Sequence, residues 1–462
     1  MTQPPWAGVP KGEAVSSLVP TLAVERRQLI EWYQRNRERS RQLFDLLDPA
    51  AYYTRPIALR NPIVFYEGHL PAFSVIALLK RGLGHPGIDV RMERLFERGI
   101  DPDSVDQAVP RSGAGTEWPS RDEVLAYGRR ADEAILDSLA HAEFDVSGDD
   151  HRAMRRGEAL FTALEHEAMH QETLLYMWHR LPHAQKRAPR GVRYERGGDV
   201  RRRGAVSIPA GRATLGADRS AVLFGWDNEF GEQEVDVDGF EIDVDSVTNG
   251  EYLEFIDAGG YGTRALWSDL GWQWREEERV THPAFWIREG SQWLWRGMFE
   301  NLQLPAAWPV YVSFEEAAAF ARWRGRRLPT EPEYHRAAFG TAAGGERALP
   351  WGTGADATRG NFDFTSWEPV PAGSRPDGVS AFGVHDLVGN GWEWTSTVFG
   401  PFPGFEPMAS YPEYSADFFD GQHYVMKGAS PATARELVRR SFRNWFRPNY
   451  PYVYAKFRTA LS

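Results

Sequence analysis

A change of pattern near residue 180 constrains the fold more than any other feature of this 462-residue chain. Before it, apolar residues recur every three or four positions with charged residues between them, which is typical of amphipathic helices. Beyond Ala205, most segments are short, punctuated by glycine and rich in tryptophan and tyrosine. We therefore expect a multidomain protein, with a helical domain followed by an α+β domain.

The first part of the chain predicts a four-helix bundle. Its helical segments are expected over residues 22–47, from near Tyr66 to 83, over 120–140 and over 157–181. Ser120 with Glu123 three residues later has the pattern of a capping box, so the third helix should begin there.

The domain boundaries follow from composition. Residues 1–190 are assigned to the bundle, and the stretch 191–204 is assigned to a linker because it is rich in glycine and arginine and poor in large apolar residues. Its arginines are expected to be solvated. Residues 205–462 form the second domain, in which 313–327 is a clear helix.

Composition excludes several classes of function. A net charge of −11 argues against a broad nucleic-acid surface. The absence of cysteine excludes disulfides, thiolate metal sites and cysteine nucleophiles. No basic start precedes an apolar stretch, and eighteen apolar residues never occur in succession, so we expect a cytoplasmic protein without a membrane partner.

Residues 166–170 read HEAMH and match the H-E-x-x-H motif of zinc peptidases. His166 and His170 would lie on one face of a helix, which suits two ligands of one metal ion, although such pairs also occur on ordinary solvated faces. The long form of the peptidase motif would need a glycine at Thr173 and a histidine at Tyr176. Both are missing, so a zinc metallopeptidase is a remote alternative.

His69 offers a different third ligand. It follows an aromatic, glycine-containing stretch that reads as a turn, so we expect His69 to begin a helix. A bundle could bring it to face His166 and His170. Three imidazoles with open coordination positions suit iron as well as zinc, whereas a lone His69 would read as a capping or core histidine.

Five stretches together carry a resemblance to a known family. They are GHLPAF (68–73), HEAMHQE (166–172), RRLPTEPEYHRAAF (326–339), GVHDLVGNGWEWT (383–395) and SFRNWFRP (441–448). The chain resembles, over nearly its whole length, the ergothioneine synthase family of non-heme iron enzymes. The resemblance implies a DinB-like four-helix bundle followed by a C-type-lectin-like domain similar to the formylglycine-generating enzyme. That enzyme itself uses cysteines, so this chain cannot share its chemistry.

The resemblance implies an O2-dependent enzyme that holds Fe(II) through His69, His166 and His170. Such enzymes join a sulfur donor to the imidazole C2 of hercynine, the Nα-trimethyl betaine of histidine. Glu172 lies off the ligand face and is expected to support the site from outside the ligand set or to be structural. Glu167 is expected to be a solvated helix residue, since peptidase catalysis is not favoured.

The second domain is expected to cover the metal. Asn444 and Trp445 match family positions near bound hercynine, and the face of Trp445 would favour its quaternary ammonium group. The stretch around residues 408–419 matches a loop that carries an active-site tyrosine in one branch of the family. Tyr411 is the first choice for that tyrosine and Tyr414 the second, as the donor of a proton to reduced oxygen.

Three departures from the family pattern concern the donor. Phe446 stands where relatives that use γ-glutamylcysteine carry an acidic residue, and residues 99–120 lack the tandem tyrosine of relatives that use cysteine. Met169 replaces a glutamine that can bond substrate. We therefore favour a selenosugar donor, as in selenoneine synthases. The alternative is an ergothioneine synthase that uses cysteine or γ-glutamylcysteine in a rebuilt pocket.

Two further alternatives come from other classes of protein. A non-catalytic binding module could keep both domains, but the presence of all three histidines argues against it. A thiol-transfer enzyme built on the same bundle would bind a metal in the same way, but it would not need the second domain.

Overall fold

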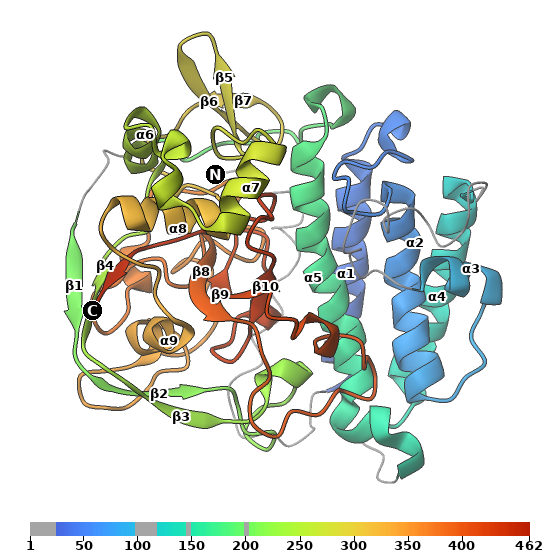
Figure 1. The fold of residues 1–462 in the computed structure, drawn as a ribbon. Helices are drawn as coiled ribbons and strands as arrows, with labels where there is room; N and C mark the ends of the chain where they lie inside the picture. Colours follow the sequence, from blue (N-terminus) through green and yellow to red (C-terminus); the bar gives the residue numbers. More distant parts are fainter. Residues whose placement is uncertain (1–24, 98–117, 145–148, 198–202) are drawn as a thin grey trace.

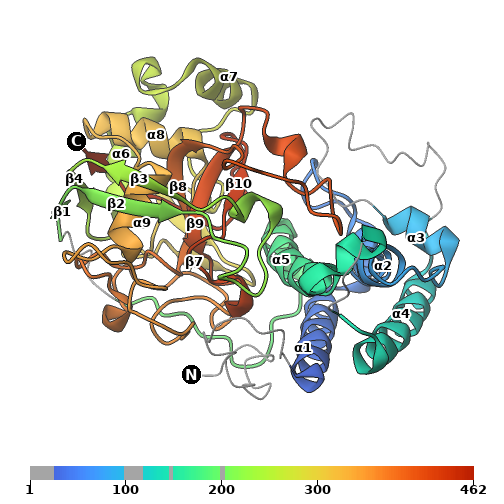
Figure 2. The same cartoon turned by 90° about the horizontal axis from the view of Figure 1, so that it is seen from below.

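The computed structural model describes residues 25–97, 118–144, 149–197 and 203–462. Figure 1 shows a helical part beside a larger part that mixes helices with short strands, and helix α5 lies between the two. The view in Figure 2 agrees with this arrangement. The expected succession of a helical bundle and an α+β domain is therefore confirmed.

The helices of the first part are α1 (Arg26–Asp45), α2 (Ile63–Ser74), α3 (Val90–Phe96), α4 (Arg121–His141) and α5 (Glu158–Arg180). Four of them, α1, α2, α4 and α5, form the predicted bundle, and α3 is a short addition beside α2. The capping box is present, since the Ser120 hydroxyl accepts from the Glu123 amide and the Glu123 carboxylate accepts from the Ser120 amide. Residues 22–24 of the first predicted helix and most of the stretch 99–120 lie outside the described residues.

Helix α2 begins earlier than expected, and His69 lies within it rather than at its start. Every residue from Ile63 to Ser74 is buried, so no polar face marks the helix in the sequence. Gly68 is a packing position and not a turn, because a Cβ there would lie 2.4 Å from the ring of Phe96. The prediction of a turn before His69 was therefore wrong.

The helix continues beyond Ser74 as a π-helical segment, Val75–Gly82. Within the described part of the chain, the stretch Ile63–Gly82 is long and apolar enough to cross a membrane. However, 89% of its most apolar window is buried inside the protein. We therefore interpret it as the core helix of the bundle.

The second part contains helices α6 (Asn249–Asp257), α7 (Asp269–Glu277), α8 (Phe314–Trp323) and α9 (Glu331–Phe339). Its strands are β1 (Ala205–Ile208), β2 (Gly211–Leu215), β3 (Gln233–Val237), β4 (Phe240–Asp243), β5 (Trp286–Glu289), β6 (Gln292–Arg296), β7 (Asn301–Gln303), β8 (Gly391–Val398), β9 (Tyr424–Ala429), β10 (Asn444–Phe446), β11 (Ala455–Lys456) and β12 (Ala460–Leu461). The largest sheet has the order β10-β9-β8-β11, with β11 parallel to β8 and the other pairs antiparallel. Smaller sheets have the orders β1-β4-β12, β2-β3 and β5-β6-β7.

One hydrophobic cluster runs through both parts and includes Trp178 of α5 and Trp392 of β8. Polar contacts also cross between the parts, since the Nδ1 of His179 lies 2.7 Å from the hydroxyl of Tyr454. Because α5 is covered by the bundle on one side and by the second part on the other, most of its residues are buried.

The described portion of the predicted linker is only partly solvated. Arg193 and Arg196 are exposed, as expected, and so is Arg190, which comes directly before the linker. Glu195, in contrast, pairs with Arg375 at 2.8 Å, so this end of the stretch is fixed to the second part.

Candidate metal centre

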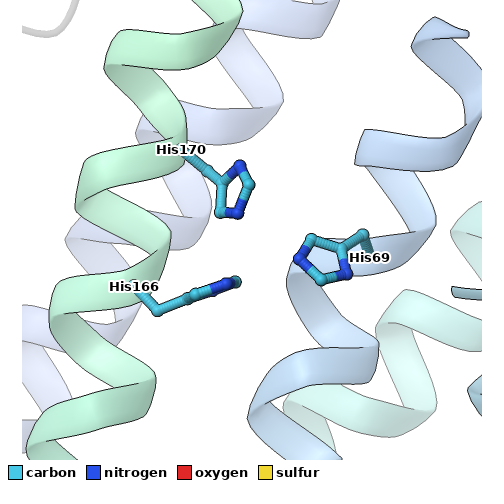
Figure 3. A group of neighbouring side chains, drawn as sticks. All are labelled: His69, His166 and His170. Carbon is cyan, nitrogen blue, oxygen red and sulfur yellow. The ribbon is translucent and has the colours of Figure 1, made fainter. Parts of the chain in front are cut away.

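Two neighbouring helices bring three histidines together. His166 and His170 lie one turn apart on α5, and His69 faces them from α2 (Figure 3). One ring nitrogen from each of the three lies within 4.8 Å of the others. The ring centroids are 4.4 Å apart for His166 and His170, and 4.9 Å and 5.1 Å apart for the pairs that include His69. The structure thus brings together the three residues that the sequence singled out.

Hydrogen bonding leaves nitrogens of these rings available for a metal. The Nδ1 of His69 lies 2.7 Å from the carbonyl oxygen of Phe96, so Nδ1–H donates there and the lone pair is at Nε2. That Nε2, and the Nδ1 atoms of His166 and His170, are buried without a hydrogen-bond partner among the described residues. Buried nitrogens of this kind are costly, and a bound metal ion would satisfy such groups.

Burial also keeps the three imidazoles neutral. It lowers the pKa of His69 to about 4. The pKa values of His166 and His170 lie well below 6.5 because of burial, with a further contribution from the neighbouring histidines. The neutral imidazole is the form that binds metal ions, so the site is ready for a metal at neutral pH.

Aromatic side chains hold two of the rings in place. Phe73 stacks on His166 with centroids 3.4 Å apart and planes 8° apart. Phe65 stacks on His69 at 5.0 Å and 18°. These contacts restrict rotation of the imidazoles and keep water from their faces.

Both predicted tyrosines lie near the histidines, in a loop of the second part. The ring of Tyr411 is 6.1 Å from that of His166 and 5.0 Å from that of Phe73. The hydroxyl of Tyr414 donates to the sulfur of Met169 at 3.5 Å, beside His170. Burial raises the pKa of Tyr414 well above 10, so its phenol is protonated at neutral pH.

Trp445 joins this group from β10. Its ring stacks on Phe399 at 4.2 Å, and its centroid is 5.2 Å from that of Tyr414. The Oδ1 of Asn444 accepts from the amide of Trp445 at 2.9 Å. A chain of contacts thus connects Trp445 through Tyr414 to Met169 of α5. Because α5 carries His166 and His170, it is called the metal helix below.

Phe446 makes a separate set of contacts. Its ring stacks on that of Tyr450 at 5.1 Å. The hydroxyl of Tyr450 in turn accepts from the Nε of the buried Arg60, at 2.9 Å. Successive strand residues point to opposite sides of a sheet, which explains why Trp445 and Phe446 have different neighbours.

The acidic residues of α5 have partners that sequence reasoning did not find. Glu167 was expected to be solvated, and this was wrong, since its side chain is buried and accepts from Ser40 at 2.6 Å and Arg37 at 3.0 Å. Glu172 accepts from the indole of Trp392 at 2.7 Å and from the Thr433 hydroxyl at 2.8 Å. Glu172 therefore connects α5 to the second part of the chain.

Glu165 is a third buried acid that the sequence analysis missed. It is bound by Arg439 at 2.7 Å and by the indole of Trp226 at 2.9 Å. The periodicity of a helix indicates which residues share a face, but it does not indicate which partner covers an acidic residue.

Comparison with known proteins divides the chain in the same way. Residues 33–174 match the DinB superfamily, and residues 195–462 match the sulfatase-modifying factor enzyme 1-like domain. A solved structure, that of PvdO from Pseudomonas aeruginosa, aligns over 56% of this chain and 94% of its own at 20% identity and a TM-score of 0.39, too low to carry an argument.

Relatives with both domains give a closer assignment. The hercynine oxygenase of Mycolicibacterium thermoresistibile is 33% identical over 96% of this chain and 95% of its own length. Ergothioneine biosynthesis protein 1 of Neurospora crassa is 28% identical over 87% of this chain and 54% of its own length. The chain therefore belongs to the ergothioneine synthase family of oxidoreductases, in which a DinB-like bundle precedes a domain similar to the formylglycine-generating enzyme.

Proposed function

We propose that this protein is an Fe(II)- and O2-dependent enzyme that forms a carbon–selenium bond at the imidazole C2 of hercynine, and thus acts as a selenoneine synthase. The observation that carries the iron part of the proposal is the neutral set of His69 and His166, which are buried, and His170, which is partly buried. Family membership supports hercynine as the substrate, because the relative that matches nearly the whole chain is named hercynine oxygenase.

The three histidines would hold the metal. Each contributes a neutral nitrogen ligand, which suits Fe(II) and leaves other coordination positions open. Bound Fe(II) would supply the redox chemistry that O2 requires. The stacked Phe73 and Phe65 would keep the imidazoles oriented while substrates enter.

Hercynine would bind between the metal helix and the second part of the chain. Its trimethylammonium group would lie against the aromatic surface of Trp445 and Tyr414, because ring faces attract quaternary ammonium ions. Asn444 uses its Oδ1 for the backbone of Trp445, so its Nδ2 is the group that would donate to the hercynine carboxylate.

A tyrosine would supply the proton that follows the reduction of O2. Tyr411 lies closer to the ring of His166, and Tyr414 is kept protonated by burial. Either phenol could donate a proton, and we favour Tyr411 because its ring contacts Phe73 and His166 directly. Tyr414 then has a packing role between Met169 and Trp445.

The donor is proposed to be a selenosugar. The surface around Phe446 is aromatic, with Tyr450 stacked on it, and the C–H faces of a neutral sugar pack well on such rings. An ergothioneine synthase that uses cysteine or γ-glutamylcysteine is the second proposal. It is favoured by a relative named ergothioneine biosynthesis protein 1 and by the positive charge of Arg60 behind Tyr450, which suits a donor with a carboxylate.

A donor competition tests both proposals. Fe(II)-loaded protein would be incubated aerobically with hercynine and, separately, with cysteine, γ-glutamylcysteine, a thiosugar and a selenosugar, and the product masses would be recorded. A product with selenium at C2, formed with the highest kcat/KM, supports selenoneine synthesis. Preference for a thiol supports the second proposal, whereas tightly held zinc without O2 uptake would favour the peptidase.

A further inference from the structure

The loop that carries both tyrosines is fixed at its two ends by different parts of the molecule. At one end, the amide and hydroxyl of Ser410 both donate to Glu158 of α5 at 2.9 Å. The Ser410 hydroxyl also lies 2.9 Å from that of Thr162. This end of the loop is therefore fixed to the bundle.

The other end is held by a segment of the second part. The Nδ2 of Asn228 donates to the Ser415 hydroxyl at 2.9 Å, and that hydroxyl donates to Asp227. Ser415 itself is fully buried, and Asp227 and Asn228 are each 1% exposed. Tyr411 and Tyr414 lie between these two fixed ends.

The same segment also contacts the metal helix and the tyrosine. The indole N–H of Trp226 donates at 2.9 Å to Glu165, the residue that precedes His166. The ring of Trp226 stacks on Tyr414 with centroids 4.0 Å apart and planes 29° apart. Glu229, at the end of the segment, binds Arg439, which in turn binds Glu165.

We propose that the segment Trp226–Glu229 is a positioning device that sets the tyrosine loop at a fixed distance from the metal helix. Trp226 fixes Tyr414 through its ring and α5 through its N–H, and Ser415 is held by Asp227 and Asn228. These residues do not touch the reacting atoms. They act through the tyrosines, so the chemical consequence rests on the proposed function, while the structural consequence does not.

Hydrogen–deuterium exchange of the full-length protein tests the structural consequence without any substrate. The reporter is the peptide that covers residues 408–415, in which the amides of Ser410 and Tyr414 are hydrogen-bonded. Ser415→Ala detaches the loop from the segment, and Trp226→Phe keeps an aromatic ring but removes the donor to Glu165. Each variant should speed exchange of this peptide by roughly tenfold, the factor that one net hydrogen bond contributes.

Trp295→Phe is the matched control. Trp295 is fully buried and donates its indole N–H to the carboxylate of Glu368 at 2.8 Å, but it packs among Phe285, Trp308 and Tyr311. Its loss should leave exchange at residues 408–415 within about twofold of the parent protein. Unchanged exchange in both test variants, or an equal increase in all three variants, would overturn the proposal.

The chemical consequence is measured as the share of consumed O2 that appears as coupled product. Trp226→Phe should lower this share severalfold at unchanged iron content, with a smaller effect on the KM for hercynine. If Trp226→Phe speeds hydrogen–deuterium exchange but leaves the share of O2 that appears as coupled product unchanged, the proposed role of the segment in the chemistry is overturned. If the wild-type protein yields no coupled product with any donor, the proposed function fails, while the exchange result still decides whether the segment holds the loop.

Discussion

Removal of one histidine should take away most of the gain in stability that metal binding gives. A ligand that binds only the folded protein raises the free energy of unfolding by RT ln(1 + [L]/Kd), which is about 2.7 kcal/mol at a metal concentration of 100 Kd. His69→Ala leaves two of the three ligand nitrogens. If affinity falls at least a hundredfold, the gain at the same metal concentration falls to about 0.4 kcal/mol.

The assay is anaerobic urea denaturation with and without Fe(II), followed by fluorescence and circular dichroism. Two probes are needed because a protein of two parts need not unfold in a single step. The quantity compared is the metal-induced shift of the midpoint, since the mutation also changes the metal-free baseline.

His335→Ala is the matched control. His335 is also a histidine buried to about 1% exposure, but its charged neighbour is Glu346 in the second part, at 3.3 Å. This variant should lose baseline stability and keep the metal-induced shift. A full shift in His69→Ala would refute its assignment as a ligand, and a lost shift in His335→Ala would show that the shift does not report the three-histidine site.

Five further outcomes are expected. Trp445→Ala should weaken hercynine binding by about tenfold or more, since a desolvated cation–π contact is worth about 2 kcal/mol. The free energy of unfolding should change less, because the side chain is only half-buried. Calorimetric titration with hercynine measures the first effect and denaturation measures the second. Tyr411→Phe should raise the proportion of donor that is oxidised without being coupled to hercynine, measured by mass spectrometry of the products. An unchanged proportion would show that another group donates the proton. In Phe446→Asp, desolvation of the new carboxylate should cost roughly 1–3 kcal/mol of free energy where it finds no partner. The variant should therefore have a lower kcat/KM for the selenosugar relative to γ-glutamylcysteine. Met169→Gln, in contrast, should change kcat/KM for all donors alike. The metal-free protein should lose stability as pH falls from 6.5 towards 4. Burial holds the folded-state pKa of His69 near 4, below its ordinary 6.5, so the unfolded chain binds the extra proton in this range. This residue alone accounts for up to about 3 kcal/mol of the free energy of unfolding, and the slope of stability against pH should be smaller in His69→Ala.

The start of α4 and the shared helix face of two histidines could be predicted from the sequence. The capping box at Ser120 and Glu123 located the start of α4, and the spacing of His166 and His170 placed both on one face of α5. Both features depend on contacts within about one helical turn, which a sequence displays directly.

Features that depend on tertiary contacts could not be predicted in this way. Helix α2 is buried on all sides, so it has no polar face, and Gly68 read as a turn although it accommodates the ring of Phe96. The roles of Trp226 and Glu165 depend on a contact between residues 61 positions apart in the chain. A single sequence carries no signal for such pairs.

The three consecutive residues Glu165, His166 and Glu167 show why the peptidase motif is misleading here. Successive residues of a helix point about 100° apart, and each of these three meets a different part of the protein. Glu165 faces Arg439 and Trp226 of the second part, His166 faces the other histidines, and Glu167 faces Arg37 and Ser40 inside the bundle. A peptidase would need Glu167 to accept a proton from water at the metal, but this carboxylate is 1% exposed and already accepts two hydrogen bonds within the bundle. The same five letters therefore lie in a helix between two domains, whose histidines face one another as candidate metal ligands and whose acidic residues bind the surrounding structure.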